Sequence, residues 1–342
     1  MSKDGRALTI AAWIVAATVI GFVFKSAKTV LFPLFLALFF YFILAPLQDL
    51  LMKIKFSRTL SLILIILFAF VVLFLMAQLF YSSGKALASD LPDYGNKLKD
   101  MLDELKNSIE LPGGGTFDPL AWVDSLDVAK VGAFLLNSLG TFVSFVSAIF
   151  LVLIFLIFML AGRGKLNDKI RRFSPHPRRS DQIIEIVGNI DRQVQKYLVI
   201  KTAISVASGV ISLVVFLAFG LRYAILWAFI TFVLNYIPNI GSFISKILPF
   251  GFSILQFGRV WPAVWMLAIL VVTDAITGSF IEPRVMGKGL GLSPLAILIS
   301  LFFWGWLWGI PGMILAVPIM VVMKIIASNF ESLRWFEALL SK

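Results

Sequence analysis

The chain has 342 residues, of which 60% are hydrophobic and 14% are charged, and its mean hydropathy is +0.96. Soluble domains of this length are far more polar, so the composition indicates a polytopic membrane protein. There is no cysteine, and the one histidine, His176, lies in a polar segment, which excludes disulfide bonds, thiol chemistry and a His/Cys metal cluster. The formal net charge is +11 and collects in short basic segments between apolar runs. This distribution is typical of cytoplasmic loops beside anionic lipid and argues against nucleic-acid binding.

Residues 1–84 predict an N-terminal membrane region of three helices. Each of its three uncharged runs is long enough to cross about 30 Å of hydrocarbon at about 1.5 Å per residue. The runs are residues 7–24, 29–48 and 59–83. The first run follows Lys3 and Arg6, as in a signal sequence, but it lacks a small-residue cleavage site, so we expect an uncleaved helix.

Residues 85–130 are polar and contain five lysines and nine acidic residues. Apolar residues in the middle of this segment have the spacing of one helical face, and the sequence LPGGGTFDP at 111–119 ends that helix. We therefore expect a small acidic helical lobe outside the cytoplasm. The lobe is either a solvated cap or a part that gates transport or docks a partner.

Residues 131–162 contain no charge and predict a long membrane helix. The loop at 163–196 begins with seven Lys and Arg residues between Arg163 and Arg179, which is the strongest cytoplasmic marker in the chain. Placing this loop in the cytoplasm puts the acidic lobe outside and both termini inside.

Residues 197–330 predict a transport core in which two spans are interrupted. After an ordinary crossing at 202–221, the apolar stretch 223–258 breaks after about 14 residues, or about 21 Å of helix, which is too short for a crossing. We expect a re-entrant hairpin whose tip contains Asn235, Pro238, Asn239 and Gly241.

A second re-entrant hairpin is expected at 289–323, entering from the opposite face after a crossing at 260–281, and residues 331–342 form a cytoplasmic tail. The break in this second hairpin contains Gly309, Pro311 and Gly312. Unwound backbone must lie against protein or a wet cavity, and such breaks mark substrate sites in secondary transporters. The alternative is that proline and glycine only kink these helices for packing. The predicted fold is thus all-α, with about eight membrane elements.

Two carboxylates lie within or just after the crossing at 260–281. Asp274 is deep in the apolar span, and Glu282 follows eight residues later, after about 800° of helix rotation and hence on roughly the same face. We expect them, with Arg284, to carry coupling ions or protons. The alternative is that Glu282 is an interfacial residue that pairs with Arg284, and Lys246 is another candidate partner.

The chain resembles the AI-2E (autoinducer-2 exporter) family of transporters over nearly its whole length. The resemblance rests on LFPLFLALFFYFILAPLQDLL, on NYIPNIGSFISKILP and above all on SFIEPRVMGKGLGLSPLAILISLFFWGWLWGIPGMILAVPIMVVMKII. The chain departs from the family pattern at two positions: Ala45, where many members carry asparagine before the proline, and Ser279, where asparagine is expected. The resemblance implies a homo-oligomer, a pentamer, in the bacterial inner membrane. It also implies either export of the furanone-type quorum-sensing signal or Na⁺(Li⁺)/H⁺ antiport.

The leading hypothesis is a proton-coupled secondary transporter that exports a small polar solute, an autoinducer-2-like quorum signal. Asn235 and Asn239 would hydrogen-bond its hydroxyl groups within a site enclosed by the two hairpin tips, and Glu282 with Asp274 would carry protons. The alternatives are a Na⁺(Li⁺)/H⁺ antiporter and a non-transporting membrane scaffold. Because the chain has no Ser/His pair, facing aspartates or phosphate-binding loop, we expect no enzyme, cofactor or metal site.

Overall fold

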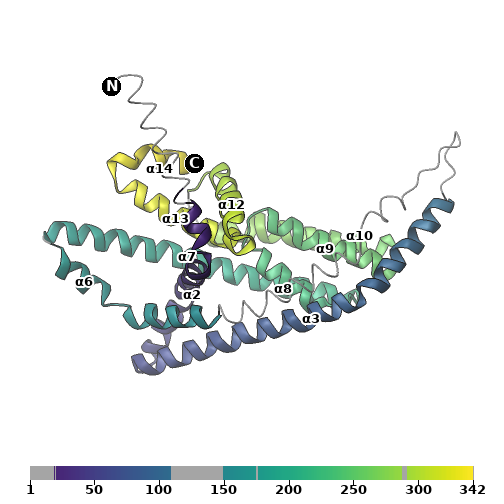
Figure 1. The fold of residues 1–342 in the computed structure, drawn as a ribbon, viewed down its shortest axis with the longest axis horizontal. Helices are drawn as coiled ribbons and strands as arrows, with labels where there is room; N and C mark the ends of the chain where they lie inside the picture. Colours follow the sequence, from purple (N-terminus) through teal and green to yellow (C-terminus); the bar gives the residue numbers. More distant parts are fainter. Residues whose placement is uncertain (1–18, 20, 109–148, 175, 287–290, 342) are drawn as a thin grey trace, which may run out of the picture. The chain divides into compact units, whose positions relative to one another are not determined.

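The computed structural model describes residues 19, 21–108, 149–174, 176–286 and 291–341 (Figure 1). This described part is helical, without strands, and its one isolated β-bridge joins Leu292 to Ser341. Within these described residues, six helices are long and apolar enough to cross a membrane, and a bent pair, Ile149–Gly162 with Leu166–Phe173, would make a seventh span. The all-α, multi-pass prediction is confirmed. The apolar run at 7–24 lies almost wholly outside the described residues.

The chain forms two compact units from alternating segments. Unit 1 comprises Met1–Phe70, Ala148–Ile200 and Met286–Lys342, and unit 2 comprises Val71–Ser147 and Lys201–Val285. The α-helices are α2 (Lys28–Lys53), α3 (Arg58–Ser108), α6 (Leu166–Phe173), α7 (Pro177–Ala218), α8 (Ala224–Leu234), α9 (Ile240–Phe257), α10 (Val260–Ile276), α11 (Glu282–Met286), α12 (Pro294–Trp308), α13 (Ile310–Ser328) and α14 (Arg334–Leu340). The described part also contains the helix Ile149–Gly162 of the bent pair, a π-helix, η1 (Thr277–Ile281), and a 3₁₀ turn, η2 (Glu331–Leu333).

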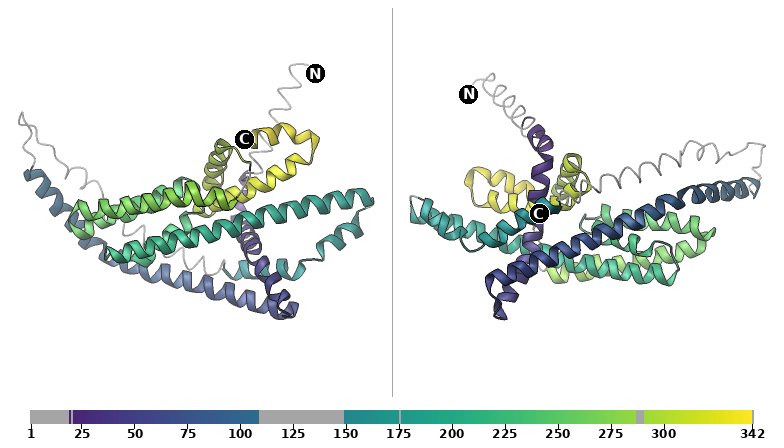
Figure 2. Two further views of the ribbon diagram at one scale, coloured as in Figure 1. Left: turned by 180° about the vertical axis from the view of Figure 1, so that it is seen from behind. Right: turned by 60° about the horizontal axis from the view of Figure 1, so that its bottom comes forward.

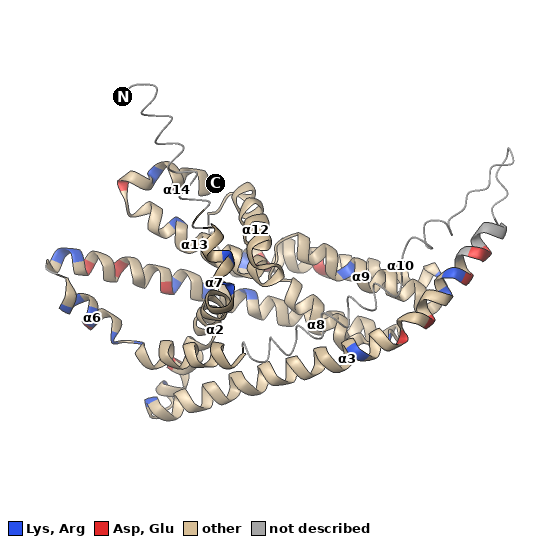
Figure 3. Cartoon of the chain, in the orientation of Figure 1, with Lys and Arg blue, Asp and Glu red and all other residues tan. Residues whose placement is uncertain are grey.

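The polar part of α3 continues its apolar part without a break. The 51-residue helix includes the apolar run at 59–83 and then residues 85–108, with Pro92 inside it. Figure 3 shows acidic and basic residues gathering at its C-terminal end. The described part of the expected lobe is therefore helical, whereas residues 109–130 and most of the helix expected at 131–162 lie outside the described residues.

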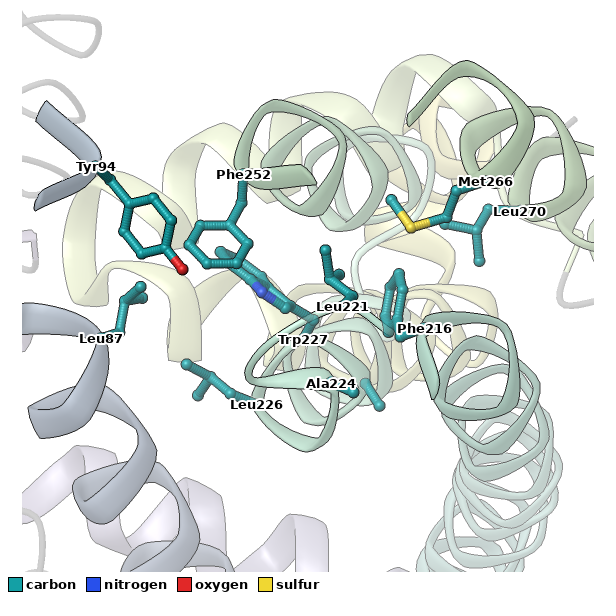
Figure 4. Packing of buried hydrophobic residues seen from close by; sticks show 11 residues of the cluster. Leu87, Tyr94, Phe216, Leu221, Ala224, Leu226, Trp227, Phe252, Met266 and Leu270 are labelled. Carbon is teal, nitrogen blue, oxygen red and sulfur yellow. The ribbon is translucent and has the colours of Figure 1, made fainter. Parts of the chain in front are cut away.

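Buried aromatic residues join this polar end of α3 to the other helices of unit 2 (Figure 4). The rings of Tyr94 and Phe252 lie 4.9 Å apart, and those of Trp227 and Phe252 lie 5.5 Å apart. Phe216 of α7 and Met266 of α10 are completely buried in the same cluster. Close packing of these large side chains holds α3, α7, α8, α9 and α10 together, because helices in lipid associate mainly through van der Waals contact.

A polar contact supplements this core where α7 ends and α8 begins. The Tyr223 hydroxyl donates a 2.5 Å hydrogen bond to Asp90 Oδ2, and Arg222 Nη1 lies 3.2 Å from the same oxygen. Burial and the bond to Asp90 raise the pKa of the Tyr223 hydroxyl. The polar end of α3 is thus attached to unit 2 by both apolar and charged contacts.

Two helical hairpins occur where the sequence predicts interrupted spans. In unit 2, α8 packs against α9 across a turn at residues 235–239, and in unit 1, α12 packs against α13 across Gly309. Asn239 and Gly309 have φ values of 60° and 73°, in the region that favours glycine and asparagine. Both helix breaks lie where the sequence places them, whereas the re-entrant course of the hairpins stays a prediction, because α9 and α13 are each long and apolar enough to span a membrane.

Each hairpin also has a glycine that its packing requires. A Cβ atom on Gly241 would lie 1.8 Å from the carbonyl oxygen of Leu234, and one on Gly312 would lie 2.0 Å from that of Trp304. Both contacts are with backbone of the preceding helix, which no side-chain rotation can relieve. The two glycines therefore let the helices of each hairpin approach closely.

In unit 1, an arginine connects α2 to the helix at Ile149–Gly162. Arg163 Nη1 donates to the Ala45 carbonyl oxygen at 2.8 Å and to Asp49 Oδ1 at 2.9 Å. Ala45, one of the two departures from the family pattern, is completely buried here. Its side chain is accordingly part of the packing of unit 1.

Candidate functional site

Unit 2 contains a cavity of about 760 Å³ beside the turn of the α8–α9 hairpin. Its wall is formed by Lys201 of α7, by the hairpin turn, and by residues of α9, α10 and η1. Helices α9 and α10 run side by side (Figures 1 and 2). Its polar lining residues are Lys201, Asn235, Asn239, Ser242, Lys246, Asp274, Thr277, Ser279 and Glu282. The cavity thus brings together residues from both ends of the second segment of unit 2, Lys201–Val285.

The hairpin turn presents two asparagines to the cavity in different ways. Asn235 Nδ2 donates to Ser205 Oγ of α7 at 3.0 Å, so part of this amide holds the turn in place. The side chain of Asn239 lines the cavity and makes no hydrogen bond to any other residue that the structure describes. Asn239 therefore has both a donor and an acceptor available for a solute.

Each carboxylate of the cavity forms an ion pair with a lysine. Lys201 Nζ lies 2.8 Å from Glu282 Oε1, and Lys246 contacts Asp274 Oδ2 and donates to the Ser242 carbonyl oxygen at 2.7 Å. The lysine side chains are only 6% and 13% exposed, and both carboxylates are 26% exposed. Charges this buried need partners, because their desolvation is otherwise too costly. With two cations and two anions, the cavity is formally neutral.

A π-helical turn separates the two carboxylates. In an unbroken α-helix, eight residues rotate by about 800°, which leaves Glu282 about 80° out of line with Asp274. The wider turn of η1, at Thr277–Ile281, rotates less per residue and so reduces this offset. Both carboxylates consequently line the cavity, as their spacing led us to expect.

The structure gives other positions to several residues expected at the site. Arg284 is exposed and does not line the cavity. The ion-pair partner of Glu282 is Lys201, not Arg284 as the sequence suggested. Gly241 is buried and packs against Leu234, so its role in this structure is to shape the turn. Pro238 lines the cavity as expected.

The second break belongs to unit 1. Gly309, Pro311 and Gly312 lie at the α12–α13 turn, where the rings of Trp304 and Trp308 lie 5.0 Å apart. Trp308 is almost fully buried, and its indole nitrogen donates to the Phe24 carbonyl oxygen at 3.3 Å. These tryptophans are packing residues of unit 1.

Sequence reasoning missed Lys201. The only signal was a cation at the very start of the uncharged stretch 202–221, which is indistinguishable in sequence from a residue that ends a membrane span. Its partner Glu282 is 81 residues away along the chain. Among the described residues there is no group of three or more His, Cys, Asp or Glu side chains that could hold a metal ion.

Comparisons with known proteins show the family of this chain. The model of the AI-2E family transporters matches residues 8–332. The chain is 32% identical to "AI-2 transport protein TqsA" of Escherichia coli (strain K12) over 305 residues, covering 88% of this chain and 86% of that protein. It is 31% identical to "Putative transport protein" of Haemophilus influenzae (88% and 87% covered) and 28% identical to "Putative transport protein YhhT" of E. coli K12 (88% and 84% covered). The chain therefore belongs to the AI-2E family, which is a family of membrane transporters and not of enzymes.

Proposed function

We propose that this protein is a secondary transporter that exports a small polar solute, of the autoinducer-2 type, in exchange for protons. The observation that supports this proposal best is the cavity of about 760 Å³, in which a broken hairpin meets two lysine–carboxylate pairs. Its size falls within the range of small-molecule sites, about 300–1,000 Å³. The similarity to an AI-2 transport protein makes a furanone diol the first solute to test.

The lining suits a neutral solute rich in hydroxyl groups. A neutral solute leaves the balanced charges of the cavity undisturbed, and Asn239 can both donate to it and accept from it. Lys201 uses one of its three N–H donors on Glu282, so the others are available to oxygen atoms of the solute. Ile237, Phe243, Leu267 and Val271 offer apolar surface to its carbon skeleton.

Proton coupling would act through Glu282, supported by Asp274. The solute would bind while Glu282 is ionised and holds Lys201 in place. Protonating Glu282 removes the charge that Lys201 contacts and so weakens the bond that positions the lysine, so that proton and solute bind alternately, as exchange requires. The second break, with Gly309, Pro311 and Gly312, stays a separate candidate for solute contact within unit 1, and Gly241 contributes by supporting the first tip. Arg284 lies outside the cavity, and because its guanidinium stays charged it would act as a fixed positive charge close in sequence to Glu282.

The placement of the protein follows from the same proposal. The seven basic residues between Arg163 and Arg179 support a cytoplasmic position for this segment, and hence for both termini, in a bacterial inner membrane. The family resemblance supports a homo-oligomer, with a pentamer as the expected form.

The test is efflux of an autoinducer-2-type furanone diol from proteoliposomes, with and without an imposed pH gradient. We expect efflux that depends on the gradient in the wild type and loses that dependence in Glu282→Gln. Glu331→Gln is the matched control, because the Glu331 side chain is 92% exposed and lies outside the cavity. Unchanged gradient-driven flux in Glu282→Gln, with the variant folded, would show that this carboxylate is not the coupling group.

A second candidate function is Na⁺(Li⁺)/H⁺ antiport, which the contact between Lys246 and Asp274 favours. A monovalent cation that binds Asp274 would replace the lysine as its partner, and the displaced lysine could then release a proton. This predicts sodium-dependent proton movement that Asp274→Asn abolishes, in vesicles where the furanone diol is not transported.

A further inference from the structure

The short helix α6 in unit 1 differs from the helix before it in direction and in charge. It is bent by 70° from the helix Ile149–Gly162 that precedes it, across a turn at residues 163–165. A span near the bilayer normal would therefore leave α6 close to the membrane plane. Figure 3 shows basic residues on α6 and on the start of α7.

Helix α6 is amphipathic. At about 100° per residue, Leu166, Ile170 and Phe173 fall within a sector of about 60°, and the charged residues lie on the remaining circumference. Leu166 is 50% exposed and Phe173 is 81% exposed. The described residues leave the Phe173 ring largely uncovered. An apolar environment for this ring must therefore come from something outside the described residues.

Positive charge surrounds this apolar face. Arg171 lies 3.6 Å from Asp181, a pair in which both side chains are 66% exposed. The structure gives no salt bridge within the described residues to the other basic side chains of the segment. These are Lys165, Lys169, Arg172, Arg178 and Arg179, all exposed.

We infer that α6 is an interfacial helix that binds the anionic headgroups of the bilayer, with Leu166 and Phe173 inserted at the boundary of the acyl chains. Eight residues span only about 12 Å, so α6 cannot cross the membrane. An apolar face that ends in an aromatic residue, combined with a Lys/Arg-rich polar face, is the composition of helices that lie in the membrane interface. An anionic surface is the complement of these unpaired cations. The inference is independent of the transported solute.

The absence of native cysteine allows a direct test with a single environment-sensitive label. The purified full-length protein carries a nitrobenzoxadiazole label at Phe173→Cys or, as the matched control, at Asp168→Cys on the opposite side of the same helix. Each is placed in nanodiscs of phosphatidylcholine alone or with phosphatidylglycerol. We expect the label at 173 to shift its emission to the blue and to escape quenching by neutral acrylamide when phosphatidylglycerol is present, whereas the label at 168 stays accessible.

The charge requirement is tested in the same assay. Lys169→Gln and Arg172→Gln should each lower the ratio of protected to accessible label at 173 by roughly fivefold in anionic nanodiscs. Leu166→Cys provides a second labelling site should Phe173→Cys fold poorly. Equal acrylamide access at 173 and 168 would overturn the inference, as would equal protection at 173 in neutral and anionic discs. Protection that appears only after addition of RNA or of a protein extract would equally overturn it in favour of another partner.

Discussion

Replacing Gly241 with alanine tests the packing of the α8–α9 hairpin directly. The added Cβ would lie 1.8 Å from the Leu234 carbonyl oxygen and 2.7 Å from its carbon, whereas real Cβ atoms essentially never come within 3.0 Å of another atom. Because backbone of the preceding helix is in the way, the two helices must separate. Overpacking of this kind costs about 1–3 kcal/mol, and we expect the upper end of that range.

Gly251→Ala is the matched control in the same helix. A Cβ there meets nothing within 4 Å, so the substitution should leave the stability unchanged or raise it by up to about 1 kcal/mol through helix propensity. The measurement is thermal unfolding in detergent, followed by tryptophan fluorescence. A loss of about 3 kcal/mol predicts a fall of about 6 °C in the unfolding temperature of Gly241→Ala.

The same substitution should reduce transport, because the displaced turn carries Asn235 and Asn239 at the cavity. Gly312→Ala should behave like Gly241→Ala in the unfolding assay, since its Cβ would lie 2.0 Å from the Trp304 carbonyl oxygen. Unfolding temperatures of both variants within about 1 °C of the wild type would refute the close packing described for the hairpins.

Two further predictions concern polar contacts of unit 2. Lys201→Met should lower the free energy of unfolding by about 2–3 kcal/mol. This is below the range of about 3–5 kcal/mol for fully buried pairs, because Glu282 keeps some access to water. Adding Glu282→Leu should restore most of the loss, whereas additive losses in the double variant would show that the two residues do not interact. Tyr223→Phe should cost about 1 kcal/mol by removing the bond to Asp90 and should speed amide hydrogen exchange in residues 85–94, and an unchanged exchange rate there would contradict a role for this bond in holding α3.

The broken spans were predictable because their cause is local. Asn239 and Gly309 adopt positive φ, and the nearby prolines limit the continuation of a helix, so residue type alone marks both turns. The expectation that Asp274 and Glu282 share a face likewise needed only their spacing. The π-turn between them was not foreseeable, since no residue type in TGSFI specifies it.

The pairing of charges could not be predicted, because it depends on which helices pack together. Lys201 reaches Glu282 across 81 residues of sequence, and Lys246 reaches Asp274 across 28. Arg284 is two residues from Glu282 and was the nearer candidate, yet the helix turns it to the exposed side. The hydrogen bond from Tyr223 to Asp90 could not be predicted for the same reason, since the two residues are 133 positions apart.

The balanced charges of the cavity have an electrical consequence. With both lysine–carboxylate pairs intact, an empty site that moves through the membrane field carries no net charge, so the membrane potential does no work on that step. A proton on Glu282 leaves the charge of Lys201 uncompensated, and moving that single charge through the whole field is worth about 2.3 kcal/mol per 100 mV. The voltage across the membrane would then drive the protonated carrier in one direction while leaving unaffected the opposite step, in which the unprotonated carrier holds a neutral solute.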